Sequence, residues 1–190
     1  MKAKVAVLIS GNGSNLQALI DASKEEDYPA EIVAVISNNK DAFGLNRASN
    51  AGIATHIADH RDYSDRETYD RAVHELLLRH STQIVCLAGF MRLLSPWFVE
   101  QWKDRLLNIH PSLLPKYKGA HAIRDAFEAG EKVTGCTVHH VVAEMDAGPV
   151  IMQAEVPVLE GDTLESLTER MHEQEHRIYP TALSHVILNK

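Results

Sequence analysis

The stretch that decides the fold is Leu106-Leu107-Asn108-Ile109-His110-Pro111-Ser112-Leu113-Leu114-Pro115. Two apolar residues followed by an alternating Asn-Ile-His predict the end of a buried strand, over residues 106–109. Because residues two apart in a strand point to the same side, Asn108 and His110 should face one cavity. Pro111 cannot pair in the sheet and keeps His110 extended. An amide and an imidazole would then lie side by side at a strand end, where open α/β sheets place their chemistry.

The chain before this stretch repeats a strand–helix pattern. Apolar runs predict strands over residues 4–10, 32–37, 55–57 and 84–88. Helical patterns lie between them at 16–23, 43–51 (closed by Gly52), 65–80 and after Ser95-Pro96. Ser64 is the expected N-cap of the third helix, with Glu67 completing a capping box. Such a repeat implies a parallel sheet with right-handed crossovers.

The pattern changes after the central stretch. A short helix is expected over 123–129, followed by strands 134–142 and 149–156 that are close enough to form an antiparallel hairpin. A long final helix over 163–185 should be bent or broken at Pro180. We therefore predict an α/β fold in one domain, residues 1–190. Its mostly parallel twisted sheet has a Rossmann-like N-terminal half and carries the C-terminal hairpin and the long helix.

Composition limits the class of protein. The 190 residues are 45% hydrophobic and 24% charged, which suits a single globular core. The net charge of −7 argues against general nucleic-acid binding. No apolar run approaches the roughly 20 residues of a membrane helix, and no secretory signal is recognised. Cys86 and Cys136 lie in apolar contexts without C-x-x-C spacing, so we expect reduced core thiols in a cytoplasmic protein.

The turn Gly11-Asn12-Gly13-Ser14-Asn15 joins the first strand to the first helix. Free N–H groups at such a helix N-terminus attract a phosphate. Leu16 occupies the third glycine position of the dinucleotide pattern G-x-G-x-x-G, which favours a single phosphate over a pyrophosphate. An ordinary strand–helix turn is the alternative.

The final helix contains His172-Glu173-Gln174-Glu175-His176, which matches the zinc-protease signature H-E-x-x-H. A catalytic zinc needs a third protein ligand. The extended form of the motif is absent, because Tyr179 and Ala182 stand at its later positions. We therefore expect no metal here.

Asp146 lies in the turn of the predicted hairpin. A turn Asp often serves only as an Asx-turn former. If the hairpin folds over the central strand, its carboxylate could reach His110, favour the protonated ring and raise its pKa. Asn108, His110 and Asp146 would then form an oxyanion-stabilising and proton-transfer set. No Ser or Cys appears as an activated nucleophile, which suggests direct transfer between two bound substrates.

Taken together, these segments resemble the phosphoribosylglycinamide formyltransferases, folate-dependent enzymes of purine biosynthesis. The similar segments are residues 5–17, 87–92, 107–115, 145–149 and 174–180. The Asn-x-His-Pro-Ser-Leu-Leu-Pro run is shared with methionyl-tRNA formyltransferase and, in altered form, with formyltetrahydrofolate deformylase. The Gly-Asn-Gly-Ser-Asn-Leu loop narrows the resemblance, and those two relatives would need a further domain for which 190 residues leave no room.

The resemblance implies transfer of the formyl group of 10-formyltetrahydrofolate to the amino group of glycinamide ribonucleotide, giving formylglycinamide ribonucleotide and tetrahydrofolate. Asn108 and protonated His110 would stabilise the oxyanion, with Asp146 raising the His pKa. The ribonucleotide phosphate and ribose would be bound by Gly13, Ser14, Asn15 and Glu175. The folate would be bound by Arg66, Met91, Arg92, Leu93, Leu94, Asn108, Val141, Val142, Ala143 and Asp146.

The resemblance also divides the domain into a ribonucleotide-phosphate half, about 1–105, and a folate and catalytic half, about 106–190. It implies small-molecule substrates, no metal, no nucleic acid, no membrane, and a monomer or homodimer. Lys118 stands where proline is common, and His172 where a glutamine often assists near the ribose. The chain ends at Lys190, somewhat early for the family. Alternatives are another amine acceptor, a binding module without turnover and a metal-dependent hydrolase.

Overall fold

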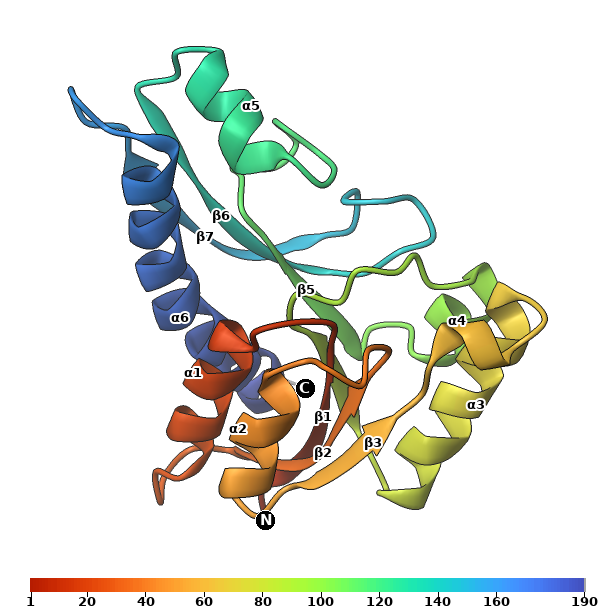
Figure 1. Ribbon diagram of the computed structural model, residues 1–190. Helices are drawn as coiled ribbons and strands as arrows, with labels where there is room; N and C mark the ends of the chain where they lie inside the picture. Colours follow the sequence, from red (N-terminus) through yellow and green to blue (C-terminus); the bar gives the residue numbers. More distant parts are fainter. Residues whose placement is uncertain (190) are drawn as a thin grey trace.

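The computed structural model describes residues 1–189; Lys190, the last residue of the predicted domain, lies outside them. Seven strands form one sheet in the order β3-β2-β1-β4-β5-β6-β7 (Figure 1). The strands are β1 (Ala3–Ile9), β2 (Ala30–Ser37), β3 (Ala54–Ile57), β4 (Ile84–Leu87), β5 (Leu106–His110), β6 (Val133–His140) and β7 (Val150–Pro157). The first five in chain order pair in parallel, whereas β6 pairs antiparallel with both β5 and β7. The predicted fold class is confirmed.

Helices cover both faces of the sheet, which explains why β1 and β4 are almost continuously apolar. The helices are α1 (Ser14–Ser23), α2 (Gly44–Asn50), α3 (Arg66–Arg79), α4 (Pro96–Gln101), α5 (Ala122–Glu128) and α6 (Leu164–Leu188), with a short 3-10 turn η1 (His60–Asp62). Helices α1, α2 and α6 lie on one face, and α3 and α4 lie on the other (Figure 1). Alternate residues of β1 divide accordingly: Val5 and Val7 join one core, Ala6 and Leu8 the other.

The strand order places the chemistry. Strand β1 has β2 on one side and β4 on the other, so the connections leaving β1 and β4 depart in opposite directions. Ligands of open α/β sheets bind in the crevice that such a reversal leaves at the carboxyl ends of the strands. The turn at 11–15 follows β1, the segment 88–94 follows β4, and the Pro111 turn follows β5.

The N-cap predicted for the third helix and the break predicted at Pro180 were wrong. The N-cap of α3 is Asp65 and not Ser64, because the Asp65 carboxylate accepts hydrogen bonds from both the backbone N–H and the hydroxyl of Thr68. Ser64 instead donates to Asp65. Helix α6 is also neither ended nor divided at Pro180. Tyr179, the buried residue before Pro180, holds the helix to the sheet. Its hydroxyl donates to the carbonyls of Leu87 on β4 and Leu107 on β5.

Two other terminal signals are confirmed. Ser95 caps α4, with Pro96 at its first position. Gly52, at φ 73°, closes α2 in the left-handed conformation that glycine adopts at low cost. Cys86 and Cys136 are buried free thiols. Across residues 1–189, the helices are too short or too polar for any of them to traverse a bilayer.

Candidate active site

Strand β5 presents Asn108 and His110 to the same cavity, as their spacing predicts. The strand ends at His110. Thr137 on β6 holds the turn that follows through two hydrogen bonds. The Thr137 hydroxyl, fully buried, donates to the Ser112 carbonyl at 2.7 Å and accepts from the Leu114 N–H at 3.2 Å. These two hydrogen bonds hold the backbone of the turn that follows His110.

Polar groups flank the His110 ring on both sides. Its Nε2 donates to the Tyr117 carbonyl at 2.8 Å, and its Nδ1 lies 3.6 Å from Asp146 Oδ2. Both neighbours are acceptors, so each ring nitrogen faces a group to which an N–H can donate. The side chains of His110 and Asp146 are only 7% and 9% exposed, which limits screening of their attraction by water. Asp146 also accepts from the Gly119 N–H at 2.9 Å.

His139, which no sequence pattern indicated, completes this cluster. It lies on β6 directly opposite Asn108, and its Nε2 is 3.3 Å from Asn108 Nδ2. Burial lowers the pKa of His139, although a hydrogen bond to the His140 carbonyl and the charge of Asp146 act in the opposite direction. Burial thus acts against a charge on the ring that stands beside the amide of Asn108.

A cavity of about 350 Å³ opens from this cluster. Nearly all the residues predicted to bind folate line it, and they come from β5 and from the segments after β4 and β6. These are Met91, Arg92, Leu93, Leu94, Asn108, Val141, Val142, Ala143 and Asp146. The exception is Arg66, an exposed residue that begins α3 and is absent from the lining.

Several contacts fix the segment 89–95 along this cavity. The Ser95 N–H donates to Asp70, a carboxylate buried on α3 whose pKa is raised by that burial. The guanidinium of Arg92 lies 5.2 Å from the centre of the Tyr69 ring. At the other end, the Met91 N–H donates to the Ser10 hydroxyl at 2.8 Å. The segment is therefore held to both α3 and β1.

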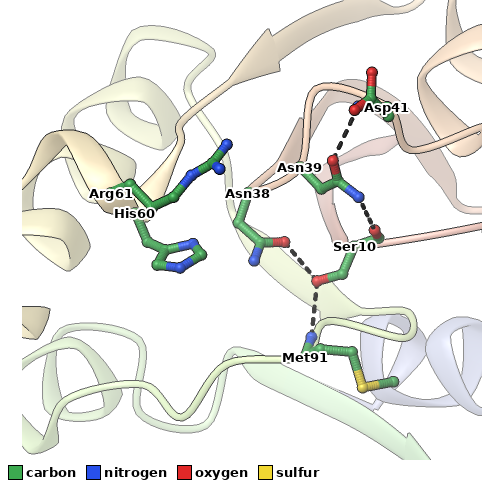
Figure 2. A pocket seen from close by; sticks show the side chains of 7 residues that line it. All are labelled: Ser10, Asn38, Asn39, Asp41, His60, Arg61 and Met91. Atoms are coloured by element: carbon green, nitrogen blue, oxygen red, sulfur yellow. Dashed lines mark hydrogen bonds between the residues drawn. The ribbon is translucent and has the colours of Figure 1, made fainter.

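Figure 2 shows a second cavity, of about 440 Å³, at the ends of β1 and β2. Ser10 lies at its base, donating to Asn38 Oδ1 and accepting from the N–H of Met91. The guanidinium of Arg61 on the opposite wall is already paired with Asp59. Met91 lines both cavities, so they adjoin. No motif in the sequence predicted this cavity.

The turn after β1 forms a cradle at the N-terminus of α1. Gly13 takes a left-handed conformation at φ 74°, and the first helical bond runs from the Gln17 N–H to the Gly13 carbonyl. The N–H groups of Ser14 and Asn15 precede that bond, in the turn where helix amides remain available to an anion. Arg47 of α2 stabilises the turn by donating to the Asn12 carbonyl at 2.8 Å. No sequence pattern predicted this contact.

Glu175 reaches this cradle from α6. Its Oε2 accepts from Asn15 Nδ2 at 3.4 Å, so the predicted phosphate and ribose residues are brought together. Glu175 is 5% exposed, and burial raises its pKa to about 7 although the Asn15 hydrogen bond lowers it. Within residues 1–189, Asn15 Oδ1 is a buried acceptor without a hydrogen-bond partner. A buried acceptor and a buried carboxyl group suit hydroxyl donors of a ligand.

The H-E-x-x-H match takes part in this cradle. His172 Nε2 lies 3.9 Å from Glu175, and the rings of His172 and His176 are stacked with centroids 6.1 Å apart. Over the described residues, no three His, Cys, Asp or Glu side chains are grouped so that they could hold a metal ion. Lys118, the other departure from the family pattern, lies 3.5 Å from Glu144 across the cavity mouth.

Replacing Gly13 with alanine should destabilise the protein by about 1–3 kcal/mol, the cost of a strained backbone conformation. An added Cβ would lie 2.7 Å from the Gly44 Cα, and an L side chain at φ 74° is disfavoured. Urea denaturation measures the effect. Gly11→Ala is the matched control, since an added Cβ there meets nothing within 4 Å. Equal stability of the two variants would contradict this account of the turn.

Replacing Glu175 with glutamine should stabilise the protein above pH 7. The pKa of Glu175 is about 7 in the folded protein and 4.5 ordinarily, so the folded state favours the protonated carboxyl group. The contribution of this group to stability is therefore fully present below pH 4.5 and is lost as the pH rises to 7. Glutamine does not ionise and avoids that loss. We expect the variant to gain about 2–3 kcal/mol more over wild type at pH 8 than at pH 5, from 1.36 kcal/mol per pKa unit. Urea denaturation at both values tests this, with exposed Glu173→Gln as control; a gain independent of pH would refute it.

The structure combines an open α/β sheet, a cavity lined by Asn108, His110 and Asp146, and an anion-binding turn at the N-terminus of α1. This combination suits the class of two-substrate group-transfer enzymes. Within that class the chain belongs to the formyl transferase family, whose model matches residues 3–183.

The relatives agree with this assignment. The chain is 54% identical to phosphoribosylglycinamide formyltransferase of Escherichia coli K12, covering 95% of this chain and 85% of that protein. It is also 54% identical to the trifunctional purine biosynthetic protein adenosine-3 of Chironomus tentans, with 96% of this chain covered. The chain spans only 13% of that longer protein.

Solved structures share the whole fold. The glycinamide ribonucleotide transformylase 1 of Symbiobacterium toebii superposes with a TM-score of 0.97 at 47% identity, covering 99% of this chain and 89% of that one. The phosphoribosylglycinamide formyltransferase of Brucella melitensis gives 0.95 at 46% identity, covering 98% and 96%. The resemblance stated from the sequence is confirmed.

Proposed function

We propose that this chain is a phosphoribosylglycinamide formyltransferase, which transfers the formyl group of 10-formyltetrahydrofolate to the amine of glycinamide ribonucleotide. The observation that carries the proposal is the cluster of Asn108, His110 and Asp146 in the cavity at the end of β5. The names of the family members at 43–54% identity support the same reaction.

The cradle would hold the ribonucleotide. The backbone N–H groups of Gly13, Ser14 and Asn15 would bind its phosphate, and Glu175 would accept hydrogen bonds from the ribose hydroxyls. The folate would occupy the 350 Å³ cavity, against the segments 91–94 and 141–146. Arg66 would lie beyond the cavity, near the folate's glutamate. The single domain 1–190 would thus divide into a phosphate-binding half and a folate-binding and catalytic half, near residue 105.

The transfer would be direct. When the substrate amine attacks the formyl carbon, negative charge develops on the formyl oxygen. The Asn108 amide and the His110 imidazolium would donate to that oxygen, in a site that largely excludes water. The His110 Nε2–H that now donates to the Tyr117 carbonyl is the donor that would turn to the oxyanion. Asp146 would keep the ring protonated through Nδ1. A proton would pass through ordered water from the attacking nitrogen to N10 of the folate. Collapse of the tetrahedral intermediate would then break the bond between the formyl carbon and N10, which releases tetrahydrofolate.

A formyl-transfer assay with an acceptor panel tests the proposal. Purified protein, 10-formyltetrahydrofolate and glycinamide ribonucleotide should give formylglycinamide ribonucleotide at the same rate with and without a chelator. Other amino sugars and amino nucleotides in place of the acceptor should react at least a hundredfold more slowly. Faster transfer to another acceptor would refute the proposed substrate, and loss of turnover with chelator would refute a metal-free mechanism.

A further inference from the structure

We infer that His139 is a positioning residue for this reaction, which holds the Asn108 amide with its nitrogen toward β6 and so prepares an N–H donor for the oxyanion. The inference rests on the proposed function and deepens it. It adds a residue that lines the proposed folate cavity but has no role toward the reacting atoms of its own, and that acts through Asn108.

The sheet itself brings the two side chains together. Asn108 of β5 and His139 of β6 are direct partners in an antiparallel pair. Side chains at such positions lie on the same face with Cβ atoms about 4.5–5.5 Å apart. An irregularity in the β6–β7 pairing falls between Val138 and His139, and bulges of this kind redirect side chains beside active sites.

Backbone contact fixes the tautomer of His139. Its Nδ1 lies 2.9 Å from the His140 carbonyl, an acceptor only, so Nδ1 carries the proton. In a neutral ring Nε2 then has a lone pair and can only accept. Burial of the side chain, which is 3% exposed, favours the neutral ring. The ionisable groups around it are Asp146, whose Oδ1 is 4.0 Å from Nε2, together with His110 and His140.

The acceptor at Nε2 selects one orientation of the Asn108 amide. Nδ2, at 3.3 Å, can donate to it, whereas the amide oxygen in that position would face a lone pair. One N–H of Nδ2 is used by His139. The other is available to the cavity that Asn108 lines. Without His139 the amide could turn over and present its oxygen, which repels an oxyanion.

Three variants test the inference in the formyl-transfer assay. His139→Leu removes the acceptor at similar volume and should lower kcat by about 10–100-fold, with both KM values within about threefold of wild type. His139→Gln, which can place an acceptor near the position of Nε2, should recover most of that loss. His140→Leu, the same substitution one residue along β6, should stay within about twofold. Thermal unfolding confirms that each variant is folded.

A double-mutant cycle separates positioning from a general structural effect. If His139 acts through Asn108, then His139→Leu should change kcat less than threefold in the Asn108→Ala background. Independent multiplication of the two losses would overturn the inference, as would wild-type kcat in folded His139→Leu. No transfer by wild-type protein would instead refute the proposed function. Crystallographic or NMR assignment of the Asn108 amide in His139→Leu then decides the inference alone: an unchanged, single orientation would overturn it.

Discussion

Asp146→Asn should lower kcat for formyl transfer by about 10²–10⁴-fold, the range expected when an essential proton-transfer arrangement is lost. Asparagine has nearly the same shape and can still accept from the Gly119 N–H, which Asp146 binds at 2.9 Å. It lacks the charge that faces His110 Nδ1 at 3.6 Å. The ring would then lose the partner that favours its protonated form, and with it a charged donor to the oxyanion.

Steady-state kinetics at pH 7 measures this loss. The free energy of unfolding should change far less than the activity does, because the asparagine side chain can still accept the hydrogen bond from the Gly119 N–H. Asp125→Asn, an exposed carboxyl on α5, is the matched control and should keep wild-type kcat. If Asp146→Asn retained more than a tenth of the wild-type kcat, the proposed support of His110 by this carboxylate would be wrong.

Asn108→Ala should lower kcat by about 10²–10³-fold, the usual cost of removing one oxyanion donor. In the proposed mechanism the amide would bind the substrate oxygen most strongly in the transition state, so KM for either substrate should change by less than about fivefold. The loss should therefore appear in kcat and in kcat/KM to a similar extent.

The matching control for Asn108→Ala is Asn50→Ala, at the exposed end of α2. A large rise in KM for the folate with unchanged kcat would show that Asn108 binds the ground state and the transition state equally. Asn108 would then be a substrate-binding residue of the cavity and not a catalytic residue.

Local patterns were sufficient for the parts of the site that lie along one strand. The alternation of Asn108 and His110 depends only on the two-residue period of a strand, and the turn after them on Pro111. The cradle at Gly13 depends on a short turn at a helix start. In each case the physical cause lies within about five residues, so the sequence alone carries it.

Other parts of the site depend on how distant segments pair. His139 faces Asn108 only because β6 pairs antiparallel with β5 in one register, across 31 positions of sequence. Arg47 reaches the cradle from another helix, and Tyr117 approaches His110 through a turn with a left-handed residue. None of these contacts leaves a periodic signal. Local patterns can also fail. Ser64 and Asp65 are both suitable N-cap residues, and the sequence pattern pointed to Ser64 although Asp65 caps α3.

The most direct test of the account is the transfer rate of wild-type protein beside that of His110→Ala, with saturating 10-formyltetrahydrofolate and glycinamide ribonucleotide. His110 is the residue on which the Asp146 carboxylate, the Tyr117 carbonyl and the end of β5 all converge. The account predicts turnover by wild type and a loss of at least a hundredfold in the variant. A folded His110→Ala protein that transfers formyl at the wild-type rate would contradict it.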